Sequence, residues 1–164
     1  MSATTTLSAS KGKTVVGSNN LLMENMHVGH DCVLGSGLII GNSTKLAGEV
    51  VIDDNAILSG CVLVHQFCHI GGYVMVQGGS RSPMDIPPYI IAGRDPLKYC
   101  GLNIVGLRGF SKEQIDLIHN TYRLLYNTGT LKEGIEEVRK TLPMTKEVEY
   151  ILNFVETSQR GIIR

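Results

Sequence analysis

A left-handed parallel β-helix, closed at its C-terminal end by a small helical domain, is the fold that this sequence predicts. Aliphatic residues recur at every sixth position, without an insertion, from Val16 to Val76. From Ser111 onward the apolar spacing becomes helical instead. A strict period of six resembles the left-handed β-helix, in which three hexapeptides form one triangular coil of 18 residues. Residues 16–81 then supply between three and four coils.

The hexapeptide also shows two positions that favour small residues. The residue after the aliphatic one is often glycine, as at Gly17 and Gly29, and glycine permits the tight corner that ends each short strand. The fourth residue after each aliphatic residue is also often modest in size. Examples of this second position are Cys32, Thr44, Ala56, Cys68 and Ser80. Both trends predict a narrow interior. Residues 18 apart should stack directly, about 4.8 Å apart.

Three amphipathic helices are expected after the repeat decays through Pro83, Pro87, Pro88 and Pro96. Ser111 and Gln114 form a capping-box pattern at the start of the first helix, and Gly129 supplies its stop. Thr130 and Glu133 repeat that pattern for a second helix, which ends before Pro143. A third apolar stripe runs from Val148 to Val155. We expect these helices to pack on one another and on a neighbouring subunit.

The expected domains are a flexible segment at 1–14, the β-helix at 15–100, a connection at 101–110 and a helical domain at 111–164. Fifteen basic and fifteen acidic residues cancel, so charge favours neither a nucleic-acid nor a membrane-surface partner. The polar first 14 residues lack the apolar stretch of a secretory signal, and no later run could span a membrane. Four cysteines without a CxxC spacing suit a reducing compartment, so the cytoplasm is expected.

The histidines of the repeat are the first chemical signal. An 18-residue coil places His65 above Ala47 and Gly29, next to His30 and roughly 10 Å along the axis from it. Gly48 follows His30 by 18 residues, so its backbone N–H should lie about one strand spacing away. A histidine base beside a glycine amide can perform acyl transfer, because one removes a proton and the other stabilises an oxyanion. Asp31 could orient the imidazole.

Five segments carry a specific resemblance: NNLLMENMHVGHDC (19–32), STKLAGEV (43–50), CVLVHQFCHIGGYVMV (61–76), DIPPYIIAG (85–93) and GLNIVGL (101–107). Together they resemble the acyl-[acyl-carrier-protein]:UDP-N-acetylglucosamine O-acyltransferase family, which performs the first step of lipid A biosynthesis. The match runs from about Ser10 to Arg164. The resemblance implies a homotrimer with its sites between subunits. It also implies transfer of a 3-hydroxyacyl chain from acyl carrier protein to the 3-hydroxyl of UDP-N-acetylglucosamine, with no cofactor and no metal.

The resemblance also implies roles for individual residues. His30 matches the catalytic base, Asp31 its orienting carboxylate and Gly48 the oxyanion amide. The remaining matches are substrate-binding residues: His27, His65 and Gln66 for the sugar, Met75 and Gly78 for acyl-chain length, Asn103 for the nucleotide, and Arg108 near phosphate.

Three departures from the family pattern stand in this sequence. The family has several more coils on the N-terminal side. Glu49 occupies a position where some members have histidine, and the basic run before Gly109 is two residues shorter. These departures keep open an alternative, a catalytically impaired trimeric remnant or scaffold of the same family. A zinc site of the γ-class carbonic anhydrase kind, built from His27, His30 and His65, is a further alternative that the flanking motifs disfavour.

Overall fold

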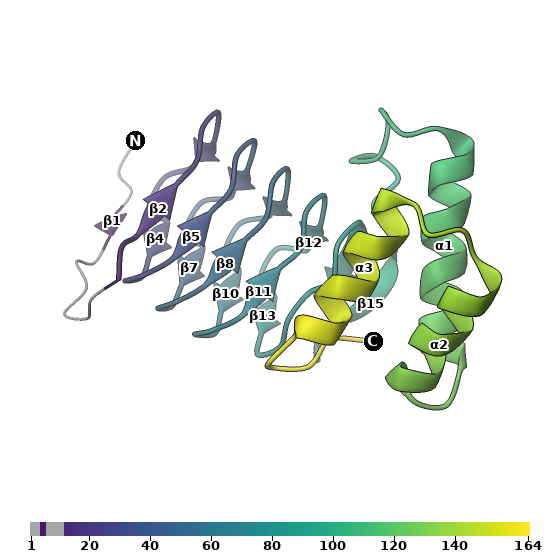
Figure 1. Cartoon of the computed structure of the whole chain (residues 1–164). Coiled ribbons are helices and arrows are strands. Elements are labelled where there is room, and N and C mark those ends of the chain that lie inside the picture. Colours follow the sequence, from purple (N-terminus) through teal and green to yellow (C-terminus); the bar gives the residue numbers. More distant parts are fainter. Residues whose placement is uncertain (1–3, 6–11) are drawn as a thin grey trace.

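A triangular β-solenoid occupies the N-terminal half of the molecule and three helices gather at its C-terminal end (Figure 1). The computed structural model describes residues 4–5 and 12–164. The strands stack into three sheets, which we call A, B and C: β1-β4-β7-β10-β13, β2-β5-β8-β11 and β3-β6-β9-β12-β14-β15; all their pairings are parallel except that of β14 with β15. The predicted left-handed parallel β-helix with a helical C-terminus is confirmed.

Each strand from β1 to β13 contains only two residues, and from β2 onward the strands recur every six residues. Their bounds are β1 Thr4–Thr5, β2 Val15–Val16, β3 Leu21–Leu22, β4 His27–Val28, β5 Val33–Leu34, β6 Ile39–Ile40, β7 Lys45–Leu46, β8 Val51–Ile52, β9 Ile57–Leu58, β10 Leu63–Val64, β11 His69–Ile70, β12 Met75–Val76 and β13 Arg81–Ser82. From β2 to β13, partner strands pair in parallel at the predicted offset, as in Val28 with Leu46 and Val64 with Ser82. The stacking rule drawn from the sequence is therefore confirmed.

Edge names follow from this order. Edge AB, where the chain turns from sheet A to sheet B, comprises residues 29–32, 47–50 and 65–68. Edge BC comprises residues 17–20, 35–38, 53–56 and 71–74. Edge CA comprises residues 23–26, 41–44, 59–62 and 77–80.

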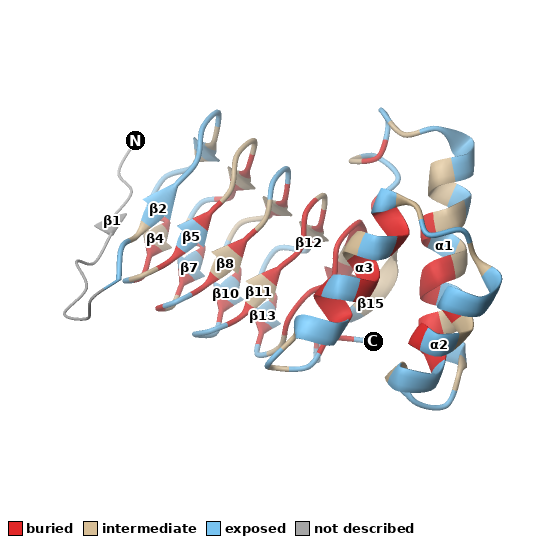
Figure 2. Cartoon of the chain, in the orientation of Figure 1, coloured by how far each residue is buried: buried red, intermediate tan, exposed pale blue. Residues whose placement is uncertain are grey.

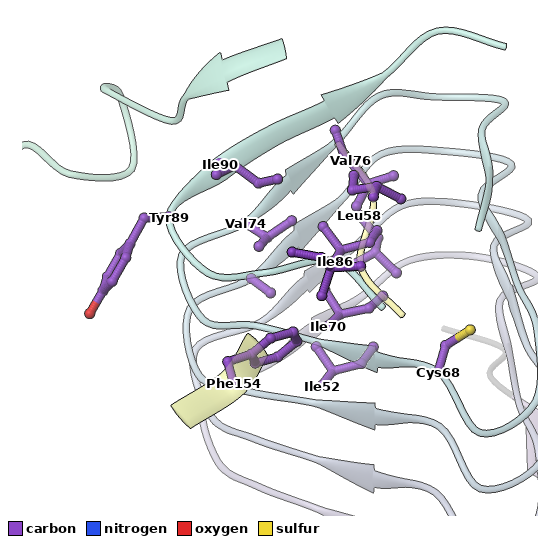
Figure 3. Close-up of a cluster of buried hydrophobic side chains, with 14 of the residues drawn as sticks. Ile52, Leu58, Cys68, Ile70, Val74, Val76, Ile86, Tyr89, Ile90 and Phe154 are labelled. Carbon is purple, nitrogen blue, oxygen red and sulfur yellow. The ribbon is translucent and has the colours of Figure 1, made fainter. Parts of the chain in front are cut away.

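Two positions of each hexapeptide fill the interior: the aliphatic residue of the strand and the smaller residue four positions after it. The sequence pattern indicated both. The strand aliphatics Leu34, Ile52 and Ile70 are buried in the column of sheet B, and Figure 3 shows the side chains of Ile52 and Ile70 there. The smaller corner residues Cys32 and Cys68 are buried as well. Burying one such aliphatic side chain contributes about 1.5–3 kcal/mol, so each coil stabilises the next chiefly through this column.

The corners are built differently from the glycine rule that the sequence indicated. The left-handed backbone conformation occurs three residues after each strand aliphatic, with φ between 58° and 73° at every sixth residue. These residues are Asn19, Asn25, Asp31, Gly37, Ser43, Glu49, Asn55, Cys61, Phe67, Tyr73 and Gly79. The glycines next to the strands serve close approach instead: a Cβ on Gly29 would lie 2.5 Å from the Ala47 carbonyl oxygen.

Sheet C continues beyond the regular coils. Strand β14 (Ile90–Gly93) pairs in parallel with β12, with Met75 opposite Ile91 at a shortened offset. Strand β15 (Lys98–Leu102) then returns antiparallel to β14. The prolines of this region therefore mark a shortened, irregular last coil that closes the hydrophobic interior with Ile86 and Ile90 (Figure 3).

The helices are α1 (Lys112–Asn127), α2 (Leu131–Thr141) and α3 (Lys146–Thr157). Both predicted capping boxes are present, at Ser111 with Gln114 and at Thr130 with Glu133. Helix α1 packs against both of the others.

The helices also pack on the solenoid of their own chain, and their packing on a neighbouring subunit stays a prediction. Tyr122 of α1 donates a hydrogen bond of 2.6 Å to the Pro88 carbonyl oxygen. The Phe154 ring of α3 lies 4.4 Å from the His69 ring of β11. This packing covers part of sheet B near the C-terminal end of the solenoid (Figures 1 and 2).

Part of the predicted flexible segment at 1–14 lies outside the described residues, namely 1–3 and 6–11. The division at residues 15, 101 and 111 stays a prediction. The helices among the described residues include none that is long and apolar enough to cross a membrane.

Candidate active site

His30 and Asp31 form an ion-pair geometry on edge AB. The Nδ1 atom of His30 lies 2.9 Å from Oδ2 of Asp31. Asp31 adopts φ 59°, so the left-handed corner turns its side chain back against the preceding residue. The Asp31 side chain is 9% exposed and the His30 side chain is 47% exposed. The carboxylate is therefore sheltered while the imidazole remains open to a ligand.

Gly48 lies directly against the His30 ring. A Cβ built on Gly48 would overlap both Nε2 and Cε1 of that ring. Only glycine leaves room for the imidazole here, which explains this glycine by contact rather than by backbone conformation. The predicted adjacency of His30 and Gly48 is therefore confirmed.

The Gly48 amide belongs to a class of corner N–H groups that face outward from the coils. On edge BC the equivalent amides bond to side chains: Ser36 N–H donates to Asp54 Oδ1 over 2.7 Å, and Gly72 N–H donates to the Tyr150 hydroxyl over 2.7 Å. Within the described part of the chain, the Gly48 N–H makes no such bond. Gly48 is buried beside the His30 ring, so an acceptor atom of a substrate would have to enter next to that ring to reach this N–H.

These three residues provide the elements of a base-assisted addition to a carbonyl group. With Nδ1 donating to the carboxylate, the Nε2 lone pair is the basic position of His30. The Nε2 atom has no hydrogen-bond partner among the described residues. A hydroxyl placed at Nε2 would lose its proton there, and a developing oxyanion would accept from Gly48.

The other histidines predicted for the site lie close by in the fold. His27 lies on β4, at the outer face of sheet A. His65 follows β10 on edge AB, and its Nδ1 lies 3.1 Å from the Gln66 carbonyl oxygen. Both His65 and Gln66 are exposed.

Four predicted substrate-binding residues lie elsewhere on the prism of the same chain. Met75 is on β12 of sheet C, Gly78 is on edge CA, and exposed Arg108 precedes α1. Asn103 is only 4% exposed; its Nδ2 donates to the Tyr73 carbonyl oxygen on edge BC, and its Oδ1 accepts from Gly106 N–H. Within one chain, the fold thus distributes the predicted residues over three edges.

A largely apolar groove of about 600 Å³ adjoins the candidate site on sheet A. Ala47 and His65 border it, and Leu63, Arg81 and Met84 line its length. The sequence analysis did not single out Leu63 or Arg81. The 18-residue rule could have found them, because both stack above His27 on the outer face of sheet A.

The described residues include no group of three or more histidine, cysteine, aspartate or glutamate side chains placed to hold a metal ion. His27, His30 and His65 accordingly do not form a ligand set within one chain, and the zinc alternative gains no support from the geometry.

Comparison with known proteins gives consistent matches. A family model described as Udp N-acetylglucosamine O-acyltransferase, domain 2, matches residues 85–163. The chain is 43% identical over 157 residues to the acyl-[acyl-carrier-protein]--UDP-N-acetylglucosamine O-acyltransferase of Aliivibrio salmonicida, covering 94% of this chain and 60% of that protein.

Solved structures agree in fold and in sequence. The UDP-N-acetylglucosamine acyltransferase of Bacteroides fragilis is 58% identical with a TM-score of 0.92, over 95% of this chain and 62% of that chain. The Arabidopsis UDP-N-acetylglucosamine acyltransferase is 34% identical with a TM-score of 0.88, over 93% and 58%. The chain thus spans about three fifths of the length of these relatives. It is similar to UDP-N-acetylglucosamine O-acyltransferases over the part of their length that it spans.

Proposed function

We propose that this chain transfers a 3-hydroxyacyl group from acyl carrier protein to the 3-hydroxyl of UDP-N-acetylglucosamine, the first step of lipid A biosynthesis. The observation that carries the proposal is the His30 imidazole, oriented by Asp31 and lying against Gly48. The relatives named above are acyltransferases by their names. The name of the Aliivibrio salmonicida enzyme gives UDP-N-acetylglucosamine as the acceptor and acyl carrier protein as the donor.

In the proposed reaction, His30 acts first as a base and then as an acid, while Gly48 and Asp31 stabilise the charges that develop. His30 Nε2 takes the proton of the sugar 3-hydroxyl as its oxygen attacks the thioester carbonyl carbon. The carbonyl oxygen becomes an oxyanion and accepts from Gly48 N–H. Collapse of the tetrahedral intermediate breaks the carbon–sulfur bond, and the carrier thiolate takes the proton back from His30. Asp31 stabilises the imidazolium between these two steps.

We propose that the working unit is a homotrimer with sites between subunits. The distribution of the predicted residues over three edges supports this, because one copy presents His30 on edge AB while Asn103 is bonded to edge BC. The outward side chains of sheet C support it as well, because Leu21, Ile39 and Ile57 form an apolar column suited to a partner surface.

In this trimer, His27, His65 and Gln66 contact the sugar, and Asn103 and Arg108 serve the nucleotide. Met75 and Gly78 limit the acyl chain. No cofactor is required, and we place the reaction in the cytoplasm.

The decisive experiment measures turnover of UDP-N-acetylglucosamine with a panel of 3-hydroxyacyl carrier-protein donors of different chain lengths. Trimeric protein is compared with His30→Ala, whose fold is checked by circular dichroism. Turnover that disappears in His30→Ala supports the proposal. A folded protein without turnover on any donor supports instead the impaired remnant of the family.

A further inference from the structure

Cys32 lies directly behind the candidate catalytic groups, inside the prism. It is one residue after Asp31 and is 0% exposed. Its Sγ donates to the Ala47 carbonyl oxygen over 3.1 Å. That carbonyl shares one peptide unit with the Gly48 N–H, so the thiol and the proposed oxyanion donor bind the two ends of the same amide.

We propose that Cys32 is a positioning residue for acyl transfer, which polarises and holds the Ala47–Gly48 peptide so that the Gly48 N–H is a stronger and better-aimed donor. Hydrogen bonds in a chain strengthen one another, because a bond accepted at the carbonyl draws electron density from the nitrogen of the same amide. The inference rests on the proposed function, since it assigns a partner to that reaction's oxyanion donor.

The hydrogen bond from Cys32 to Ala47 is one example of a bond that the repeat forms at several corners. On edge AB, the carbonyl that accepts it belongs to the same peptide as the proposed oxyanion donor. Interior donors elsewhere also reach the corner carbonyl 15 residues ahead: Thr44 Oγ1 donates to the Ser59 carbonyl oxygen over 2.9 Å, and Asn20 Nδ2 donates to that of Gly35 over 2.9 Å. At Ala47, the peptide that accepts the bond leads into Gly48, the residue that lies against the His30 ring.

The thiol remains a donor over the working pH range. Burial is the main cause that raises the pKa of Cys32, so the sulfur keeps its proton at neutral pH. A buried, protonated thiol is also a poor nucleophile, which agrees with a role through the peptide rather than through substrate.

A matched control is available in the same interior column. Cys68 follows Cys32 by 36 residues, is equally buried, and donates to the Ser82 carbonyl oxygen over 3.6 Å. Residue 83 is proline, so the peptide that accepts this bond has no N–H to strengthen. Cys68→Ala therefore removes a buried thiol and leaves the hydrogen bond from Cys32 to the Ala47–Gly48 peptide unchanged.

The kinetic test compares Cys32→Ala, Cys32→Ser and Cys68→Ala with wild type at saturating donor and with UDP-N-acetylglucosamine varied up to saturation. Removing an oxyanion donor costs 10²–10³ in kcat, and polarisation contributes about 10–30% of a bond, so Cys32→Ala should lower kcat about two- to eight-fold. KM for UDP-N-acetylglucosamine should stay unchanged. Cys32→Ser should recover most of kcat, and Cys68→Ala should match wild type.

A second measurement does not depend on turnover. In protein labelled with 15N-glycine, the Gly48 amide proton should move upfield in Cys32→Ala and return toward its original shift in Cys32→Ser, with no change in Cys68→Ala. Active wild type with kcat equal in Cys32→Ala and Cys68→Ala would overturn the inference, and so would an unmoved Gly48 resonance. Inactive wild type in which the Gly48 resonance moves as described would overturn the proposed function and leave the hydrogen bond in place.

Discussion

The molecule carries two histidine–aspartate pairs beside a corner glycine, and their surroundings differ. The open corner on edge AB consists of His30, Asp31 and Gly48, with a histidine–carboxylate distance of 2.9 Å. The covered corner consists of His69, Asp53, Gly72 and Tyr150, where His69 Nε2 lies 2.9 Å from Asp53 Oδ1. The first pair joins neighbours in the sequence, and the second joins residues 16 apart on adjacent coils.

The C-terminal helix makes the difference between them. At the covered corner, the Tyr150 hydroxyl of α3 accepts from Gly72 N–H over 2.7 Å and donates to Asp53 Oδ2 over 2.5 Å. The Phe154 ring of the same helix packs against the His69 ring at an interplanar angle of 39°. At the open corner, His30 is 47% exposed and the Gly48 amide has no partner within the described chain. Similar groups thus hold helix α3 against the solenoid at the covered corner, and form a candidate active site at the open corner.

The largest expected effect separates the two histidines. His30→Ala removes the proposed base and should lower kcat by about 10²–10⁴, with unfolding free energy within about 0.5 kcal/mol of wild type because the side chain is solvent-facing. His69→Ala should instead lower stability through lost packing against Phe154 and leave kcat within two-fold. Steady-state kinetics and urea unfolding on both variants test this. Equal activity in wild type and His30→Ala would remove His30 from the mechanism.

The two glycines provide the next comparison. A Cβ at Gly48 overlaps the His30 ring, so Gly48→Val should reduce kcat by about 10²-fold or more through the displaced base and amide. A Cβ at Gly72 would lie 2.9 Å from the Asp54 carbonyl oxygen and 3.2 Å from the Tyr150 hydroxyl, so Gly72→Val should chiefly lower the melting temperature. Paired kinetic and melting data with the reverse ordering would contradict the oxyanion role.

A smaller effect is expected from the hydroxyl that fills the covered corner. Tyr150→Phe leaves the Gly72 amide and the Oδ2 atom of Asp53 without the hydroxyl and should cost about 1–3 kcal/mol of unfolding free energy, although Asp53 Oδ1 keeps His69. Its kcat should stay within two-fold of wild type, since Tyr150 is remote from edge AB in the coil order. Chemical denaturation measures the first quantity. A loss of turnover larger than the loss of stability would show that the covered corner also serves the reaction.

The smallest effect concerns alkaline pH. Burial, followed by the bond to Asp53, raises the pKa of Tyr150, and burial also raises that of Tyr126. Unfolded tyrosines lose their protons near pH 10 while these stay protonated, so stability is complete below about pH 10 and falls as pH rises further. The slope should reach up to about 1.4 kcal/mol per pH unit for each such tyrosine. Tyr150→Phe should show a shallower decline in melting temperature between pH 9 and 11 than wild type; an unchanged slope would contradict it.

Much of the fold was predictable because its contacts are periodic. Once Val28, Leu46 and Val64 are recognised as equivalent, the parallel register follows without further information. The capping boxes at Ser111 and Thr130 were predictable for the same kind of reason, since both partners of each box lie within four residues. The corner conformation was assigned to the wrong position because glycine marks close approach as well as positive φ, and most left-handed corners here carry other residues.

The candidate site also has features that were predictable from the repeat and features that were not. The adjacency of His30 and Gly48 was predictable, because it is one coil of the repeat. The thiol of Cys32 behind that amide was not, because residue type alone does not reveal which carbonyl a buried donor reaches.

By itself, the sequence determined the coil, its register, the helix starts and the stacking of the candidate catalytic groups on one edge, because each depends on short or strictly repeated separations. Only the tertiary structure decided that α3 folds back onto sheet B, where the Tyr150 hydroxyl meets Asp53 and Gly72 from far along the chain. That long-range packing has no period in the sequence. It determines which of two similar corners is covered and which stays open to substrate.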